Sequence, residues 1–191
     1  MNDTQNITEY VQKKQESLVS IHDEVIIGEK RYTFSSRDVP DCFFSMFLPE
    51  EVTVMNDISI KLKYPAAERP KIILTTHDET VNFLFTPTEF EFSSKEAKST
   101  MEGFRAVIKR MNPSFVICEP QLLITEQKKE VYWFDYRAPV LETELYNIMY
   151  AAEINGTLLI GGFNCPAEYR FWWKSLVLQM IKTIAVKDDD A

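Results

Sequence analysis

Residues 131–184 read VYWFDYRAPVLETELYNIMYAAEINGTLLIGGFNCPAEYRFWWKSLVLQMIKTI, and the rest of the chain is arranged around them. The stretch contains three runs rich in β-branched and aromatic residues, Val131–Tyr136, Glu144–Ile154 and Thr157–Phe163. Such residues favour pleated, buried strands. Asn155-Gly156 joins the last two runs, and both residues accept the positive φ of a two-residue hairpin turn. We therefore predict three successive antiparallel strands here.

A broad apolar helix is predicted from about residue 167 to residue 184, directly after these strands. Pro166 stands before its first turn, where the missing N–H of proline is tolerated. The helix carries Trp172 and Trp173, and together with Trp133 these side chains could line a ligand pocket. Packing of all three tryptophans in the core between sheet and helix is the simpler interpretation.

The remaining elements are predicted from hydrophobic periodicity, turn residues and caps. They are a helix over residues 4–20; a hairpin of residues 24–27 and 31–34; a strand at 43–48 after a break at 36–40; a half-exposed strand at Ile58–Tyr64; a hairpin of residues 71–76 and 81–85 across His77-Asp78-Glu79; a helix over Ser93–Met111 that begins with a capping box; and strands at 115–118 and 122–125.

Runs of strands separated by helices, rather than strict alternation, indicate an α+β fold. We expect a single, mostly antiparallel, twisted sheet of about six to seven strands, covered by helices in α/β/α layers. Residues 1–40 would form an N-terminal helix and hairpin extension, residues 41–186 the main domain, and residues 187–191 an acidic tail.

Composition limits the classes of function. The 191 residues carry a formal net charge of -8, which argues against a nucleic-acid-binding face. No apolar leader segment and no run of about 18 apolar residues is visible, so we expect a cytosolic protein without a membrane span. Cys42, Cys118 and Cys165 are widely spaced, which favours free thiols in a reducing compartment.

The chain resembles the PsbP-like superfamily from Cys42 to Ile184. The resemblance is carried by Phe44-Ser45-Met46-Phe47-Leu48-Pro49, by Tyr64-Pro65 with Arg69-Pro70, by the hairpin into Val81-Asn82-Phe83, and by the order of the later elements. The superfamily includes an extrinsic subunit of photosystem II, a Ran-binding nuclear import factor and many small bacterial proteins. It implies an antiparallel sheet covered by helices, and a function in binding proteins rather than in chemistry.

Polar residues give weak evidence of a reactive site. His77-Asp78-Glu79 could hold a metal or serve as acid and base, but we prefer a solvated hairpin turn; His22 is far away in the sequence and has the same preferred explanation. Asp135 and Arg137 share a strand face and could pair with Glu142 and Glu144 across strands, or a carboxylate pair there could serve glycoside chemistry.

Two further features have structural explanations that we prefer. Gly161-Gly162 lacks the context of a phosphate-binding loop, so we expect a bulge or a close approach of the last helix. Cys165 precedes a helix, which could lower the pKa of its thiol and make it a nucleophile, but no histidine is near in the sequence. We therefore assign no catalytic, cofactor-binding or metal residue and expect no cofactor.

The sequence thus favours a non-enzymatic module of adaptor or immunity type in a bacterial cytosol. It would bind another protein through a sheet edge or through the concave face beside the last helix. Two alternatives stay open: a carrier of a small apolar ligand held between sheet and helix, and a hydrolase with a carboxylate site.

Overall fold

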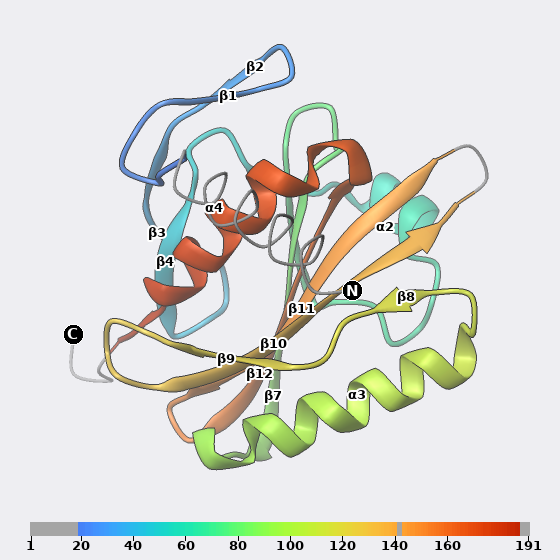
Figure 1. The fold of residues 1–191 in the computed structure, drawn as a ribbon. Coiled ribbons are helices and arrows are strands. Elements are labelled where there is room, and N and C mark those ends of the chain that lie inside the picture. Colours follow the sequence, from blue (N-terminus) through green and yellow to red (C-terminus); the bar gives the residue numbers. More distant parts are fainter. Residues whose placement is uncertain (1–18, 141–142, 188–191) are drawn as a thin grey trace, which may run out of the picture.

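The computed structural model describes residues 19–140 and 143–187, and Figure 1 shows their arrangement. The helix predicted over residues 4–20 and the acidic tail therefore lie almost entirely outside the described residues. The elements in chain order are β1 (Val25–Ile27), β2 (Lys30–Tyr32), β3 (Phe34–Asp38), β4 (Phe44–Pro49), β5 (Thr53–Val54), α2 (Asp57–Lys63), β6 (Ile72–Thr75), β7 (Asn82–Glu91), η1 (Ser94–Glu96), α3 (Ala97–Met111), β8 (Val116–Ile117), β9 (Gln121–Ile124), β10 (Glu130–Pro139), β11 (Glu144–Ile154), β12 (Thr157–Pro166), η2 (Ala167–Tyr169), α4 (Arg170–Lys182) and β13 (Ala185–Val186).

An eight-stranded antiparallel sheet forms the centre of the molecule. Its strand order is β5-β6-β7-β12-β11-β10-β8, and β9 also pairs with β10. The three long strands β10, β11 and β12 are those predicted from residues 131–163, and they are joined by the antiparallel ladders expected from their short links. The antiparallel α+β architecture is therefore confirmed.

The strands are distributed over three sheets instead of the single one expected. β3 and β4 pair with the short strand β13, which follows α4, and β1 with β2 forms a separate hairpin. The ring of Phe44 on β4 meets the ring of Phe85 on β7 at 5.8 Å. The apolar side of β4 thus packs on the face of the main sheet instead of extending its edge.

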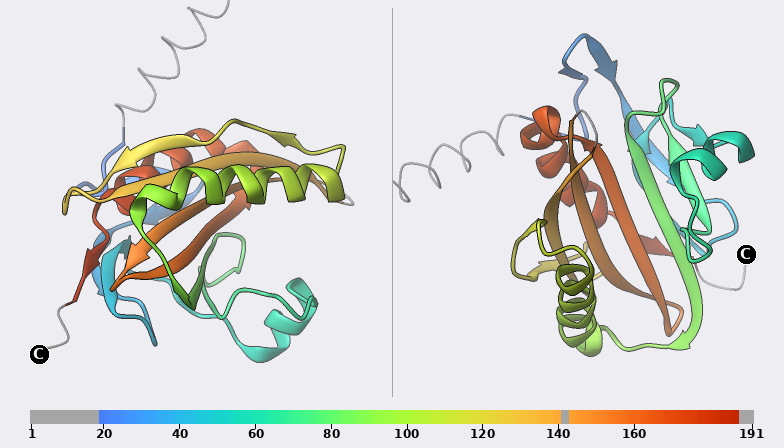
Figure 2. Two further views of the ribbon diagram at one scale, coloured as in Figure 1. Left: turned by 90° about the horizontal axis from the view of Figure 1, so that it is seen from below. Right: turned by 90° about the vertical axis from the view of Figure 1, so that its right-hand side faces the viewer.

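Consecutive residues of β10 point to two different cores. Trp133 belongs to a large cluster with Trp173 of α4, whereas Phe134 belongs to a smaller cluster with Met101 of α3. Because side chains alternate across a strand, the two clusters lie on opposite faces of the sheet. Figure 2 shows α3 and α4 on these two sides.

The helix over Ser93–Met111 is confirmed, with a short 3₁₀ turn before α3. The capping box joins the Ser93 N–H to the Glu96 carboxylate at 3.0 Å, and the side chain of Ser93 accepts from the Glu96 backbone in return. The early amides of the helix are therefore satisfied from side chains, as the spacing of serine and glutamate predicts.

The half-exposed strand predicted at Ile58–Tyr64 is wrong, because this segment is helix α2. The Asn56 side chain accepts hydrogen bonds from the N–H groups of Ile58 and Ser59 at 3.1 and 3.0 Å. This N-cap starts a helix despite the alternation of apolar and polar residues. Ile58 and Leu62, four residues apart, are consequently largely exposed.

The break predicted at residues 36–40 is also misplaced. Residues 36–38 continue strand β3, in which Arg37 pairs with Met46 of β4. The guanidinium of Arg37 donates to the carbonyls of Pro49, Glu50 and Val52, which ties the end of β4 to β3. A polar strand is stable here because it lies at the outer side of the small sheet.

No helix within residues 19–140 and 143–187 is both long enough and apolar enough to cross a membrane.

Candidate functional site

Strand β9 is an edge strand of the main sheet. It pairs antiparallel with β10, and in the described part of the chain no other strand pairs with it. Leu123 is buried, whereas Leu122 and Ile124 are 49% and 43% exposed. An edge strand with exposed apolar side chains is a template for pairing with another extended chain.

The ladder shows which backbone groups of β9 are available. The Thr125 N–H donates to the Lys129 carbonyl at 3.0 Å, so Thr125 faces β10. Residues of an antiparallel strand face their partner alternately, and Leu123 therefore also faces β10. The N–H and C=O groups of Leu122 and Ile124 point away from the sheet.

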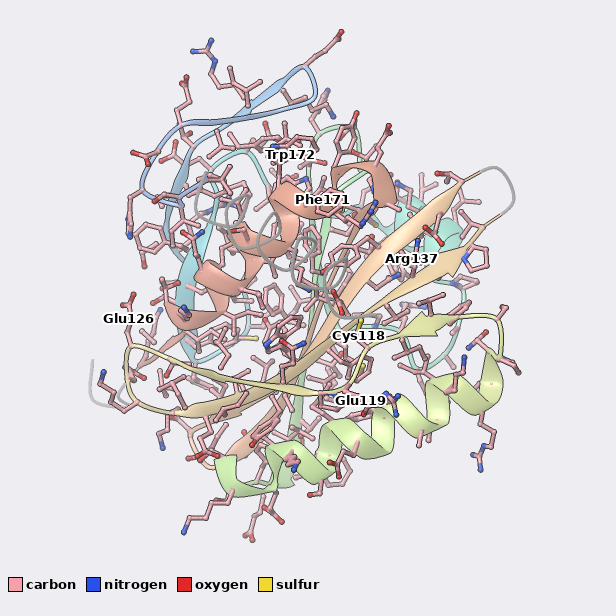
Figure 3. The ribbon with its side chains drawn as sticks, viewed as in Figure 1. Cys118, Glu119, Glu126, Arg137, Phe171 and Trp172 are labelled. Carbon is pink, nitrogen blue, oxygen red and sulfur yellow. The ribbon has the colours of Figure 1, made fainter. Side chains whose placement is uncertain are left out.

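Figure 3 labels residues at both ends of this edge. Cys118 and Glu119 lie on the connection between β8 and β9, whereas Arg137 on β10 and Phe171 on α4 lie farther away. Glu126 follows β9, and its N–H donates to a carbonyl at the end of α4 at 2.8 Å. The edge is thus anchored to α4 at one end and open along its length.

The expectation that all three tryptophans are core residues is wrong for Trp172. Trp133 and Trp173 are buried, but Trp172 and its neighbour Phe171 are 41% exposed. Successive residues of a helix are about 100° apart around its axis, and this rotation places Trp172 at the border of the buried face of α4 while Trp173 lies inside it.

A buried carboxylate lies beneath α4. Asp135 is 5% exposed, and its Oδ2 is 3.0 Å from Lys174 Nζ and accepts a 2.8 Å hydrogen bond from the Tyr146 hydroxyl. The Lys174 ammonium also lies 5.2 Å from the centre of the Trp133 ring. Asp135 Oδ1 has no hydrogen-bond partner among the described residues.

The electrostatics of this cluster favour an ionised Asp135 and a protonated Cys118. Burial acts to raise the pKa of Asp135, but the charge of Lys174 and the hydrogen bonds to the carboxylate outweigh it, so this pKa lies below its ordinary value. Burial and the nearby Asp135 charge raise the pKa of the Cys118 thiol to about 11. At neutral pH the carboxylate is thus a weak base and the thiol is protonated.

The predicted cross-strand pairing is confirmed for one pair. Arg137 Nη1 lies 3.2 Å from Glu144 Oε2, with both side chains partly exposed. Asp135 pairs with the helix residue Lys174 instead of with the strand glutamates, and Glu142 lies outside the described residues.

The histidines do not join a reactive cluster. His77 is exposed in the turn between β6 and β7, and His22 is exposed with its ring 5.4 Å from Phe47. Residues 19–140 and 143–187 contain no group of three or more metal-ligating side chains close enough to hold an ion.

Gly161 is required by a neighbouring tyrosine, and neither a bulge nor the last helix explains it. A Cβ at Gly161 would lie 1.9 Å from the ring of Tyr150, its cross-strand partner on β11. The irregularity of β12 falls instead between Thr157 and Leu159. The Tyr150 ring therefore fills the space above the glycine.

Cys165 does not fit the nucleophile interpretation. Its thiol is fully buried at the end of β12, and burial raises its pKa. Cys165 is part of β12, so the buried environment of this strand, rather than the start of the following helix, determines the pKa of its thiol.

Sequence reasoning missed Lys174 as the partner of Asp135. The signal was a single lysine that follows the aromatic run Phe171–Trp173, on a helix that buries six of its thirteen residues. A charge at such a position requires a partner, although the sequence does not say which one.

Comparison with known proteins identifies the fold only. No family model matches the sequence, and no curated protein sequence shows significant similarity. The solution structure of cyanobacterial PsbP from Synechocystis sp. PCC 6803 is similar, with a TM-score of 0.60 and 12% identity over 89% of this chain and 99% of that chain.

Two crystal structures are more distant. One, from Bacteroides thetaiotaomicron VPI-5482, has a TM-score of 0.48 and 14% identity over 78% of this chain and 47% of that chain. The other, a Pseudomonas aeruginosa protein of unknown function described as a putative regulator, has a TM-score of 0.44 and 8% identity over 81% and 98% of the two chains. The PsbP-like fold expected from the sequence is confirmed by the cyanobacterial structure.

Proposed function

We propose that this chain is a non-enzymatic binding module of PsbP-like fold, which binds another protein by adding a strand of that protein to β9. The observation that carries the proposal is the open edge at Leu122 and Ile124. Their outward backbone groups offer hydrogen bonds, and their side chains are about half exposed. In strand addition, the backbone supplies affinity and alternate side chains supply specificity.

The polar groups beside this edge support binding over catalysis. The Asp135 carboxylate is held by Lys174 and Tyr146, and its pKa is lowered, which is the wrong direction for a general base at neutral pH. The raised pKa of Cys118 is likewise the wrong direction for a nucleophile.

Charge and thiols indicate the kind of partner and compartment. A net charge of -8 favours a basic partner, whose approach would be slowed by added salt. We expect an extended segment with apolar side chains at alternate positions. The free thiols of Cys42, Cys118 and Cys165 fit a reducing compartment such as a bacterial cytosol.

The test compares two substitutions at one residue. Leu122→Pro removes an N–H that points away from β10, so the ladder of β9 is retained while strand addition is blocked. Leu122→Ala keeps the N–H and removes only side-chain contact. The partner is first isolated from the native lysate with the wild-type chain, and its dissociation constant is then measured for both variants by calorimetry.

Strand addition predicts that Leu122→Pro weakens binding at least about tenfold, or about 1.4 kcal/mol, and that Leu122→Ala weakens it less. Circular dichroism checks that both variants fold. A partner that binds wild type and Leu122→Pro equally well refutes strand addition at β9, and failure to recover any specific partner refutes the binding module.

A further inference from the structure

A cavity of about 410 Å³ opens beside Phe43, where the start of β4 meets strand β7 and the turn between β11 and β12. The volume is within the range of small-molecule sites. No residue of β9 lines this cavity, so the site is separate from the edge to which a partner strand would bind.

A bulge in β7 forms one wall of the cavity. Leu158 of β12 lies alone opposite three residues of β7, residues 88–90, because the register of the ladder shifts here. The Thr88 hydroxyl donates to the Leu158 carbonyl at 2.8 Å, and Pro87 has no N–H with which to continue the ladder. Bulges are frequent next to active sites, where they redirect a side chain, and this bulge brings Glu89 to the cavity.

The inner wall of the cavity is apolar and partly aromatic. Phe44, Ile154 and Leu159 line it and belong to the large buried cluster. Phe43 lines it as well and is 64% exposed, so a large aromatic ring is left in contact with water. A ligand in the cavity would cover this ring and remove apolar area from water. The face of such a ring also attracts a cation.

The charged side chains of the lining, Asp41 and Glu89, are both carboxylates. Within residues 19–140 and 143–187, neither carboxylate forms an ion pair or accepts a hydrogen bond. Lys71 does not line the cavity, and its ammonium group donates to the Pro87 carbonyl at 2.9 Å. Burial and the Asp41 charge raise the pKa of the Cys42 thiol in the lining to about 11, so this thiol is neutral at pH 7. The lining therefore favours a positively charged ligand.

We infer that this cavity binds a small organic cation with an apolar body, such as a protonated arylalkylamine. The apolar body packs on Phe43 and on the inner wall, and the ammonium group lies at the carboxylates of Asp41 and Glu89. The net charge of -8 adds a longer-range attraction. A neutral molecule of the same shape gains only the apolar contact, and an anion of that shape is repelled.

The test titrates the full chain with three probes of similar shape, followed by calorimetry and by the backbone amide signals in ¹H–¹⁵N NMR spectra. The probes are 1-naphthylmethylamine, which is protonated at pH 7; 1-naphthylmethanol, which is neutral; and 1-naphthoate, which is an anion. We expect the amine to shift the amide signals of Phe43, Asn155 and Leu158 saturably. It should bind at least about fivefold more tightly than the alcohol, and the anion should bind most weakly.

The double variant Asp41→Asn, Glu89→Gln removes both charges at exposed positions and keeps the size of the side chains; asparagine also tolerates the φ of 53° at position 41. It should bind the amine at least about fivefold more weakly and the alcohol unchanged. Glu91→Gln is the matched control, because Glu91 is exposed on the same strand but does not line the cavity, and it should bind the amine like the wild type. The inference is overturned if the amine does not bind or binds no more tightly than the alcohol, if the double variant binds the amine like the wild type, or if Glu91→Gln weakens binding as much as the double variant does.

Discussion

Replacing Lys174 by methionine removes the charge that compensates the buried carboxylate of Asp135. Asp135 is 5% exposed and its Oδ2 lies 3.0 Å from Lys174 Nζ, so few waters can replace the ammonium group. Breaking a buried ion pair from one side destabilises a protein by about 3–5 kcal/mol. The Lys174 side chain is 19% exposed, and we therefore expect the lower end, about 3 kcal/mol at pH 7.

The loss should depend on pH with a definite sign. In the wild type the folded pKa of Asp135 is below its ordinary value, so the pair stabilises the fold above about pH 4, and this is lost as pH falls through the folded pKa. In Lys174→Met burial acts without the opposing charge, and the folded pKa rises above the unfolded one. The variant therefore loses stability at neutral pH, where Asp135 is charged, and regains it as Asp135 is protonated at lower pH. The difference from wild type should shrink from pH 7 to pH 4.

Urea unfolding, followed by tryptophan fluorescence at several pH values, measures this difference. Arg137→Met is the matched control: the Arg137–Glu144 pair has a similar distance but side chains 41% and 37% exposed, so its loss should amount to at most about 1 kcal/mol. Adding Asp135→Asn to Lys174→Met should restore about 2 kcal/mol, because asparagine removes the buried charge and keeps an acceptor for Tyr146. A loss below about 1 kcal/mol for Lys174→Met, or one that grows toward low pH, would refute the reasoning.

Three further substitutions test other parts of the fold by urea unfolding. Gly161→Ala should destabilise by about 1–3 kcal/mol because its Cβ would overlap a tyrosine ring on β11, whereas Gly162→Ala, whose nearest neighbour would be 3.3 Å away, should change stability by less; equal losses would contradict this account. Asn56→Ala should destabilise by about 0.5–2 kcal/mol through loss of the α2 cap, and unchanged amide exchange in α2 would argue against it. Trp173→Ala should destabilise by about 3–5 kcal/mol and Trp172→Ala by far less; equal losses would mean that both side chains are core residues.

The prediction of the central strands succeeded because two independent signals agreed there. The aromatic and β-branched runs indicate strands, and Asn155-Gly156 fixes the link between two of them. Asn155 and Gly156 both have positive φ in the structure, at 48° and 75°. The short links are too short for the crossover that parallel strands need, so neighbouring strands must be antiparallel.

The prediction at Ile58–Tyr64 failed because local signals conflicted. Four apolar residues at every second position favour a strand, whereas the Asn56 cap and Asp57 in the first turn favour a helix. Neither signal is decisive in seven residues. The segment buries none of its residues, so the alternation of apolar residues gains no stability from core contacts. The N-cap therefore determines that the segment is a helix.

The candidate site was less accessible from the sequence than the fold. The residues Asp135 and Arg137 were identified, but their partners come from different elements: Lys174 from α4 and Glu144 from β11. The open edge of β9 depends on which strand fails to acquire a neighbour, and the cavity beside Phe43 depends on how the start of β4 meets a bulge in the distant strand β7.

The sequence by itself determined the α+β class, the antiparallel order of the long strands and the end of α3, because these follow from period, turn residues and caps within short segments. Only the tertiary structure decided which tryptophan is exposed, which strand has an open edge and which lysine neutralises Asp135. These depend on contacts between residues far apart in the chain, and side-chain type does not specify a partner until packing has brought the elements together.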